Sequence, residues 1–413
     1  MKKSTHQIIG LSVCIFVLSP MFSWAQLIIG QYEDEAPFRT WNTLGVPTAS
    51  SLGIGEARFA LAADTSAGLI NPALLISLPR FSFTVNGSHS AASFNKYSIV
   101  NTGVLLSQGN SSMRVYTIDF AGFSATYRDW AFGLSVGLLE HYERPAQNPE
   151  FKYQSQILYD LDFQQDGILR NYNISLARKL FRRLSLGIGI NFVSGYFEKS
   201  IEENYFYNDV MISDVKTHDF KGYYVNGGIV VGVTDRLTAA AIFRTPYSKK
   251  AESESKLRYF SPQGNTDIKT EVSATSIYKQ PLVMGVGFDF RLSEVLRVAS
   301  DVSYFNWSSY SVESFDEELS RRFKNIIKIG GGFEYSSSLH LFGQTIRVPL
   351  RAGVSYDPQP IKEPSTYYLY YTIGLGVYWR GIHLDAGAIF GNEKGSGHDL
   401  SARKLALSLS YSL

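Results

Sequence analysis

From residue 81 to residue 413 the chain alternates apolar residues with small or polar ones, and this period of two constrains the fold more than any other feature. Side chains two positions apart lie on the same face of a β-strand, so the alternation predicts strands with one apolar face. The last stretch shows it clearly, where Leu405, Leu407, Leu409, Tyr411 and Leu413 alternate with Ala406, Ser408, Ser410 and Ser412. The pattern by itself leaves open which face meets water.

The alternation divides into fourteen predicted strands whose connections are long and short in turn. The predicted strands are 81–90, 114–127, 130–144, 169–181, 184–198, 218–234, 236–247, 266–291, 294–308, 322–337, 346–357, 366–379, 381–391 and 401–413. Most short connections are tight turns such as Arg128-Asp129 and Arg182-Arg183, and 338–345 is somewhat longer. Short turns on one side and long loops on the other are typical of outer-membrane barrels. The sequence therefore predicts an all-β fold, a transmembrane antiparallel β-barrel of about 14 strands.

The even strand count leaves both ends of the barrel on the short-turn side, the periplasm. The last strand must pair with the first, because each unpaired backbone group in hydrocarbon costs roughly several kcal/mol. Many predicted strands are longer than the roughly 9–11 residues that cross a bilayer, so we expect the barrel to project beyond the outer surface.

Residues 1–25 have the pattern of a secretory signal, with Lys2 and Lys3 before an apolar core at 8–17. Cys14, inside that core, is the only cysteine, so we expect no disulfide in the mature chain. Removing the signal lowers the 39 Lys and Arg to 37, which equals the 37 Asp and Glu. A neutral chain argues against nucleic acid as a partner. No later apolar run reaches the roughly 18 residues of a transmembrane helix.

Residues 26–80 precede the strands and do not alternate. Within them, residues 61–75 are rich in Ala, Gly and Ser and contain the turn Asn71-Pro72-Ala73. A barrel of about 14 strands is too wide for its own side chains to fill. We therefore expect a signal peptide at 1–25, an N-terminal plug or hatch in the lumen at 26–80, and the barrel at 81–413.

Four short motifs occur in order along the chain. They are Ala62-Ala63-Asp64-Thr65-Ser66-Ala67-Gly68-Leu69-Ile70-Asn71-Pro72-Ala73, Arg244-Thr245-Pro246-Tyr247, Asp301-Val302-Ser303-Tyr304-Phe305-Asn306-Trp307-Ser308-Ser309-Tyr310 and Leu350-Arg351-Ala352-Gly353-Val354-Ser355-Tyr356-Asp357-Pro358-Gln359-Pro360. Together they resemble motifs of the FadL/TodX family, outer-membrane transporters for long-chain fatty acids and other hydrophobic compounds. The resemblance runs from about residue 52 to the C-terminus.

The resemblance implies passive uptake of hydrophobic compounds such as long-chain fatty acids at the outer membrane of a Gram-negative bacterium. It implies outer-membrane lipid and the barrel-assembly machinery as further partners. The chain departs from the family in two ways: it ends in Leu413 instead of Phe or Trp, and residues 26–50 do not align. Asn71-Pro72-Ala73 also occurs in a related barrel family that serves protein secretion and surface attachment. That function is the alternative.

The turn Asn71-Pro72-Ala73 is the first candidate site. Pro72 disfavours the helical conformation at Asn71, and an Asn side chain can bond its own backbone in a tight turn. The turn is either a hatch whose displacement opens a path or only the chain reversal that joins plug to barrel, and the sequence leaves both open.

Charged residues on the small-residue face form the second candidate set. If the apolar face meets lipid, these charges point into the lumen: Asp289, Asp301, Lys328, Glu334, Arg347, Arg351 and Asp385. Arg351 or Lys328 would then be placed to hold a fatty-acid carboxylate. The alternative, which we favour, is a network of Arg, Asp and Glu that anchors the plug.

A bend in the third strand, through which ligand leaves sideways, is implied by the resemblance. Gly133 and Gly137 are the candidates for this kink, or else they are small residues opposite a packed plug. Aromatic residues in the predicted outer loops, among them Phe151, Tyr205 and Tyr259, are candidates to capture an apolar ligand. The alternative is packing of the loops over the barrel mouth.

The histidines are scattered without the spacing of metal ligands. No nucleophile can be placed beside a base. We therefore expect no enzyme activity, no catalytic residue, no metal site and no cofactor.

Overall fold

The computed structural model describes residues 46–61, 63–101, 104–143, 150–153, 156–313, 323–341, 344–362, 365–395 and 400–413. The predicted signal and the first part of the predicted plug, residues 1–45, lie outside the described residues. No helix among the described residues is long and apolar enough to cross a membrane.

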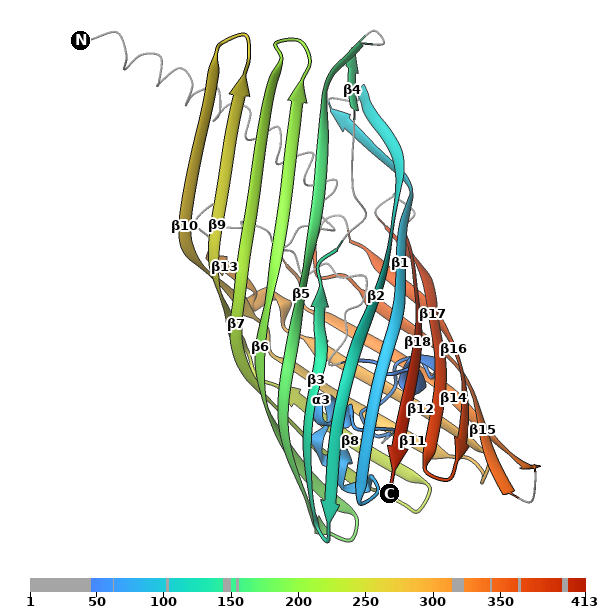
Figure 1. The fold of residues 1–413 in the computed structure, drawn as a ribbon. Coiled ribbons are helices and arrows are strands. Elements are labelled where there is room, and N and C mark those ends of the chain that lie inside the picture. Colours follow the sequence, from blue (N-terminus) through green and yellow to red (C-terminus); the bar gives the residue numbers. More distant parts are fainter. Residues whose placement is uncertain are drawn as a thin grey trace.

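One antiparallel sheet closes on itself to form the barrel shown in Figure 1. Its segments are β1 (Phe81–Asn101), β2 (Val104–Tyr127), β3 (Trp130–His141), β4 (Glu150–Tyr153), β5 (Gln156–Phe181), β6 (Leu184–Tyr205), β7 (Val210–Gly232), β8 (Leu237–Arg244), β9 (Tyr247–Ser261), β10 (Thr266–Gln280), β11 (Val283–Arg291), β12 (Leu296–Phe305), β13 (Ser311–Glu313), β14 (Ile326–Leu341), β15 (Gln344–Pro358), β16 (Tyr367–Trp379), β17 (Ile382–Lys394) and β18 (Leu400–Ser412).

These segments make fourteen strands, as the sequence predicts, because four strands are interrupted. β3 continues as β4, β8 as β9, β10 as β11 and β12 as β13, since both parts of each pair lie along a common neighbour. Pro246 separates β8 from β9, and Pro281 separates β10 from β11. Proline cannot donate to the ladder, so it interrupts a strand where it occurs.

The first and last strands close the barrel, which confirms the predicted closure. β1 pairs β18 from Ser82 opposite Ser412 to Phe94 opposite Leu400. At the end of this ladder the amide of Leu413 donates to the carbonyl of Phe81 at 2.9 Å. The barrel therefore has no open edge along this seam, as a sheet in hydrocarbon requires.

The tight turns lie at one end of the barrel, together with the C-terminus (Figure 1). We call this the turn end and the opposite end the hairpin end. The turns Arg128-Asp129 and Arg182-Arg183 occur where the sequence predicts them. The predicted longer turn at 338–345 is wrong in length, because β14 and β15 stay paired as far as Leu341 and Gln344.

At the hairpin end several strands are much longer than predicted. They form a tall wall that consists of β1, β2, β5–β7, β9 and β10 (Figure 1). The predicted loops after β6 and β8 are paired strands: β6 meets β7 up to Tyr205 opposite Val210. Phe151, Tyr205 and Tyr259 therefore lie on β4, β6 and β9, and their placement on loops is wrong. Beyond the apolar zone both faces of a strand carry polar residues, so the alternation disappears while the backbone ladder continues.

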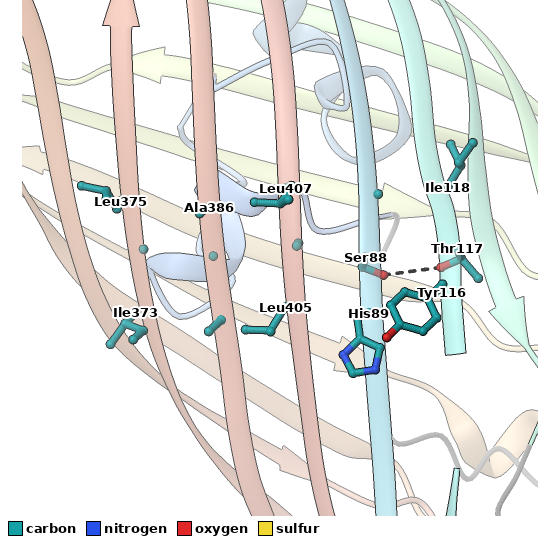
Figure 2. Close-up of a pocket in the computed structure, with 15 residues that line it drawn as sticks. Ser88, His89, Tyr116, Thr117, Ile118, Ile373, Leu375, Ala386, Leu405 and Leu407 are labelled. Carbon is teal, nitrogen blue, oxygen red and sulfur yellow. Dashed lines mark hydrogen bonds between the residues drawn. The ribbon is translucent and has the colours of Figure 1, made fainter. Parts of the chain in front are cut away.

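The large apolar side chains face outward and the small or polar ones face the lumen. On β18, Leu407 is 69% exposed and its neighbour Ala406 is 2% exposed. Asp289, Asp301, Lys328, Glu334, Arg351 and Asp385 are all buried inside, as the sequence predicts. The outer face also carries a groove of about 870 Å³ across β16, β17, β18, β1 and β2, drawn in Figure 2.

Residues 46–80, here called the luminal segment, lie within the barrel (Figure 1). The segment contains two short helices, α2 (Ala49–Gly53) and α3 (Ala67–Ile70), and a 3₁₀ turn, η2 (Pro72–Ser77). α2 packs on β15–β18, whereas α3 and η2 pack on β3 and β5–β7. The amide of Ala49 donates to Asn86 Oδ1 at 3.1 Å and to Ser408 Oγ at 2.9 Å, so wall side chains satisfy its start.

Candidate functional site

The turn Asn71-Pro72-Ala73 is fully enclosed between the luminal segment and the wall. Asn71 Oδ1 accepts a hydrogen bond from the amide of Ala73 at 3.2 Å, which is the local turn that the sequence predicts. The Asn71 side chain also donates to the carbonyl of Phe59 at 2.7 Å. Two wall glycines make room, because a Cβ on Gly187 would lie 2.2 Å from Ala73 N and one on Gly228 would lie 2.0 Å from Asn71 Oδ1.

A buried ion pair fixes another part of the luminal segment. Glu56 Oε2 lies 2.8 Å from Lys328 Nζ on β14, and Asp357 Oδ2 on β15 lies 3.4 Å from the same ammonium. Burial would raise the pKa of Glu56, but the positive charges of Lys328 and Arg58 outweigh burial and lower that pKa. Nearby, Asp301 Oδ2 accepts the amides of Arg58 and Phe59 at 2.6 and 3.0 Å.

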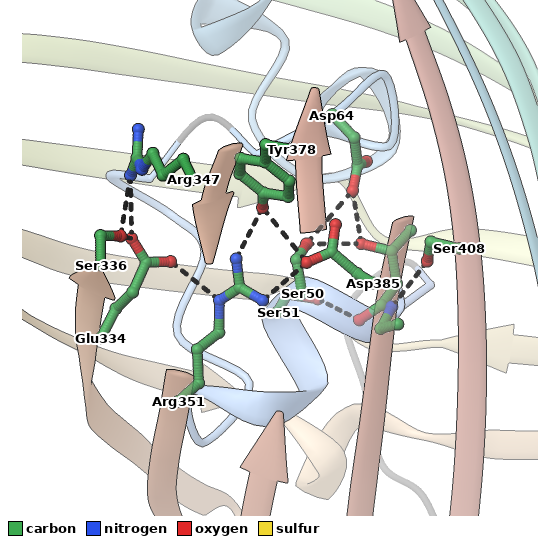
Figure 3. Close-up of polar contacts among 12 residues, drawn as sticks. Ser50, Ser51, Asp64, Glu334, Ser336, Arg347, Arg351, Tyr378, Asp385 and Ser408 are labelled. Carbon is green, nitrogen blue, oxygen red and sulfur yellow. Dashed lines mark hydrogen bonds and ion pairs between the residues drawn. The ribbon is translucent and has the colours of Figure 1, made fainter. Parts of the chain in front are cut away.

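A second network lies on the wall beside α2, drawn in Figure 3. Arg351 donates to Glu334 Oε2 at 2.8 Å, to Asp385 Oδ1 at 2.7 Å and to Tyr378 OH at 2.6 Å. Arg347 reaches Glu334 Oε1 at 3.3 Å. A buried guanidinium with this many partners is neutralised in place.

Lys328 and Arg351, the two predicted carboxylate ligands, are thus both engaged by acids of the chain. The structure brings Lys328 against the luminal segment and Arg351 against its own wall. A fatty-acid carboxylate at either position would have to displace Glu56 or Asp385 from a buried contact, at a cost typical of breaking buried pairs. The Lys328–Glu56 pair fits the plug-anchoring alternative, whereas the contacts of Arg351 stay within the wall.

An aromatic cluster occupies the lumen toward the hairpin end. Its rings come from four strands or their ends: Tyr142, Phe197, Phe220 and Tyr278. Lys249 Nζ lies 4.9 Å from the centre of the Phe220 ring and 3.7 Å from Glu140 Oε2. The same connected set of buried apolar residues includes Leu69 and Ile70 of the luminal segment.

Arg244 borders this set and differs from the other buried cations. It is 7% exposed at the end of β8, with its guanidinium carbon 5.7 Å from the ring centres of both Tyr224 and Tyr247. Within the described part of the chain it forms no ion pair, and its Nε is buried without a hydrogen-bond partner. A buried guanidinium without an acid is a ready site for a carboxylate.

A row of inward asparagines connects the Arg244 site to the luminal segment. Asn171 donates to Tyr224 OH at 2.6 Å and to Asn191 Oδ1 at 3.1 Å. Asn191 donates to Asn226 Oδ1 at 2.7 Å, and Asn226 donates to the carbonyl of Gly68 at 3.1 Å. Hydrogen bonds that share partners in this way strengthen one another, so the row forms a continuous polar connection from Tyr224 to α3. The O and N assignment of each amide follows from this network.

The wall changes its pairing beside the aromatic cluster, where β3 leaves β2. The β2–β3 ladder ends at Phe120 opposite Gly137, whereas β3 follows β5 to His141 opposite Ile168. A bulge lies between Leu138 and Glu140 in the second ladder. Across the resulting wall gap, Arg170 on β5 donates to the carbonyl of Ile118 on β2 at 3.1 Å.

Gly133 and Gly137, the predicted kink residues, lie before the wall gap and are regularly paired with β2 and β5. A Cβ on Gly133 would lie 2.9 Å from Leu75, and one on Gly137 would lie 2.6 Å from Leu69. Both glycines therefore give the luminal segment room. The distorted backbone lies on the neighbouring strand instead, at Gly167 of β5. Its φ of +144° is one that L side chains rarely adopt.

The predicted aromatic ligand residues are not brought together with the cluster. Tyr205 donates to Glu203 at 2.8 Å on the tall β6–β7 hairpin, and Tyr259 lies on β9 opposite Ile268 of β10. Sequence reasoning placed Arg244 in a motif but gave it no ligand role. The nearby Pro246 is a usable signal, because a proline interrupts the strand and so marks Arg244 as a strand-end residue.

No protein-family model matches the sequence, and no curated protein matches it either. A solved structure of a Pseudomonas aeruginosa FadL homologue matches with a TM-score of 0.65 and 16% identity, over 89% of this chain and 99% of that one. The chain has the fold of FadL. The P. putida toluene transporter TodX matches with a TM-score of 0.64 and 14% identity, over 90% and 99%. The Ralstonia pickettii toluene transporter TbuX gives 0.62 and 14%, over the same shares. The FadL fold that the motifs imply is therefore confirmed.

Proposed function

We propose that the chain is an outer-membrane protein of a Gram-negative bacterium that takes up hydrophobic compounds, such as long-chain fatty acids, without an energy source. The closed barrel with an apolar outer face suits a bilayer. The turn end is then periplasmic and the hairpin end faces outward. Outer-membrane lipid and the barrel-assembly machinery are the partners that this location requires.

The observation that supports transport most is the Arg244 site beside the aromatic cluster. An elongated apolar ligand needs a long run of apolar contacts and, if it is an acid, one cation at its head. The buried apolar set that runs from Phe323 to Leu69 offers the contacts, and Arg244 offers the cation without a competing acid among the described residues. Aromatic hydrocarbons, for which TodX and TbuX are named, would use the same contacts without the cation.

Ligand movement in this proposal involves the luminal segment and the wall gap. The hydrogen bonds from Tyr224 to Gly68 carry a change at Arg244 to α3 and to the hatch Asn71-Pro72-Ala73. Leu69 packs against Gly137, the residue at which the β2–β3 ladder ends, so movement of α3 would free the lumen side of the wall next to the gap. The ligand leaves sideways there, and Glu56–Lys328 holds the rest of the segment in place. No step needs a catalytic group or a cofactor.

A binding measurement tests the role of Arg244. The purified chain in detergent is titrated with laurate and with uncharged dodecanol, with intrinsic tryptophan fluorescence as the readout. The charged hydrogen bond predicts that Arg244→Gln weakens laurate binding about tenfold and leaves dodecanol binding nearly unchanged. The matched control is Arg236→Gln, at an exposed turn residue of the turn end.

Other outcomes would contradict the transport proposal or the role of Arg244. If wild type binds neither laurate nor dodecanol, the transport proposal fails. Stable co-purification of a partner protein would then support the secretion or surface-attachment alternative. If laurate binds and Arg244→Gln changes nothing, the ligand site lies elsewhere.

A further inference from the structure

The groove on the outer face of the barrel is built from matching rows of residues on five neighbouring strands. Strand register places Ile373, Ala388, Leu405, His89 and Tyr116 side by side in one row. The next row toward the turn end is Leu375, Ala386, Leu407, Gly87 and Ile118. Ala386 and Ala388 on β17 thus flank Leu407 and Leu405 on one side, and Gly87 on β1 flanks Leu407 on the other, where His89 lies beside Leu405 (Figure 2).

The row just beyond the groove, toward the hairpin end, carries two arginines. Ala91 on β1 lies opposite Arg403 on β18 and opposite Arg114 on β2. Both arginines are exposed, whereas Ala91 between them is 5% exposed although it faces outward. Within the described part of the chain neither arginine forms an ion pair or a hydrogen bond through its side chain. Neighbouring strands lie about 4.8 Å apart, so the two Cα atoms are about 10 Å apart.

The arginines lie at the outer boundary of the apolar zone. Ala91 is about ten residues from the start of β1, which is about 33 Å along the strand and about 25 Å along the axis at a tilt of about 40°. The apolar band of such barrels is about 25 Å tall. Tyr371, in the same row as Arg403, is half exposed, as expected of an interfacial aromatic girdle.

A polar atom at the head of the groove also lacks a partner. His89 Nε2 is buried and has no hydrogen-bond partner among the described residues, while its ring packs on Tyr116 at 4.4 Å between centroids. A histidine facing hydrocarbon is costly unless something bonds it. The cations, the unbonded histidine and the apolar groove thus lie in sequence along one line of the wall.

We propose that this surface is a binding site for one anionic membrane lipid, with its phosphate between Arg114 and Arg403 and an acyl chain in the groove. Two arginines whose Cα atoms lie about 10 Å apart suit a phosphate lying between their flexible side chains. Below it, a lipid oxygen accepts from His89, and the chain lies along Gly87 or Ala386 and Ala388. The site rests on the proposed membrane location and is independent of transport. Its lipid stabilises the seam where β18 meets β1.

Native mass spectrometry of the delipidated, full-length barrel tests the site. The probes are phosphatidylglycerol and phosphatidylcholine with the same acyl chains, and lipid A as a second phosphate-bearing lipid. The expected result is an apparent Kd at least tenfold lower for phosphatidylglycerol or lipid A than for phosphatidylcholine. The double variant Arg114→Gln/Arg403→Gln removes this preference, and Arg236→Gln, with one charge lost at a turn, keeps it.

A groove variant separates headgroup from tail. Ala388→Phe fills the groove and weakens phosphatidylglycerol binding fivefold or more with both arginines present. Heat-modifiable migration on gels establishes whether each variant is folded. If Ala388→Phe does not fold, the variants of the two exposed arginines test the lipid site by themselves. Equal affinity for both lipids, or no effect of the double variant, overturns the proposal. The proposal is also overturned if inorganic phosphate competes as effectively as the whole lipid. It is overturned as well if the chain forms a dimer that Ala388→Phe abolishes and the arginine variants leave intact.

Discussion

Lys328 Nζ lies 2.8 Å from Glu56 Oε2, and this contact joins the barrel wall to the luminal segment across more than half of the chain. Both side chains are buried, and Glu56 has a positive φ of 64° directly after Gly55, so the backbone turn is shaped to present the carboxylate. The contact is a strong link between the two parts of the molecule, because it is charged, buried and short.

Removing the charge of Glu56 loosens the luminal segment. Glu56→Gln removes the carboxylate charge that lies 2.8 Å from Lys328, so we expect a loss of about 1–3 kcal/mol in the stability of the seated segment. Single-channel recordings in planar bilayers measure this as more frequent brief openings. The control Glu254→Gln removes a carboxylate whose side chain is 40% exposed on β9 and leaves the recordings unchanged.

Acidification should also loosen the luminal segment, because it protonates Glu56. The positive charges of Lys328 and Arg58 lower the pKa of Glu56, so its contribution is complete above the ordinary value of about 4.5 and is lost as pH falls through the lowered pKa. We expect the opening frequency of wild type to rise below about pH 4.5. Recordings of Glu56→Gln over the same range show a smaller rise, and an identical rise in both proteins would assign the effect to other groups.

The position of the turn Asn71-Pro72-Ala73 depends on wall glycines. Gly228→Ala places a methyl group 2.0 Å from Asn71 Oδ1, so Asn71 must move and its bonds to Ala73 and Phe59 weaken. We expect a loss of about 1–3 kcal/mol in unfolding free energy, measured by urea titration in micelles. Gly232→Ala, whose methyl would meet its nearest atom at an ordinary 3.6 Å, is the control and stays near wild type.

Arg170 closes the wall gap. Its hydrogen bond to the carbonyl of Ile118 replaces the missing β2–β3 ladder at this point. Arg170→Gln should speed hydrogen exchange of β2 around Ile118 about five- to tenfold, since one such bond contributes about 1 kcal/mol or more. Arg178→Gln on the same strand, which removes a guanidinium 4.7 Å from the Trp130 ring, leaves this exchange unchanged. If both variants change this hydrogen exchange equally, Arg170 has no specific role in closing the wall gap.

The architecture could be predicted from the sequence because hydrocarbon permits few solutions. Leu405 to Leu413 alternate with small residues strictly, and an apolar face of that kind must be closed into a barrel. The same reasoning failed beyond the membrane zone. Lys249, Lys250, Glu252 and Glu254 look like a solvated loop, yet they form β9, because outside the bilayer the ladder persists without an apolar face.

The candidate site was only partly predictable, for a related reason. Alternation assigns Arg351 and Lys328 to the lumen, but it cannot say that Asp385 and Glu56 neutralise them, because those partners come from other strands and from the luminal segment. Arg244 is the converse case: what sets it apart is that no acid among the described residues pairs with it, and a missing partner leaves no trace in the local sequence.

Uptake by whole cells tests the central claim most directly. Cells with the chain, without it and with Arg244→Gln are given radiolabelled palmitate and toluene in turn, and the initial uptake rates are compared. We predict that the chain raises both rates and that Arg244→Gln lowers the palmitate rate about tenfold while leaving toluene nearly unchanged. Equal rates with and without the chain, for both compounds, would contradict the account.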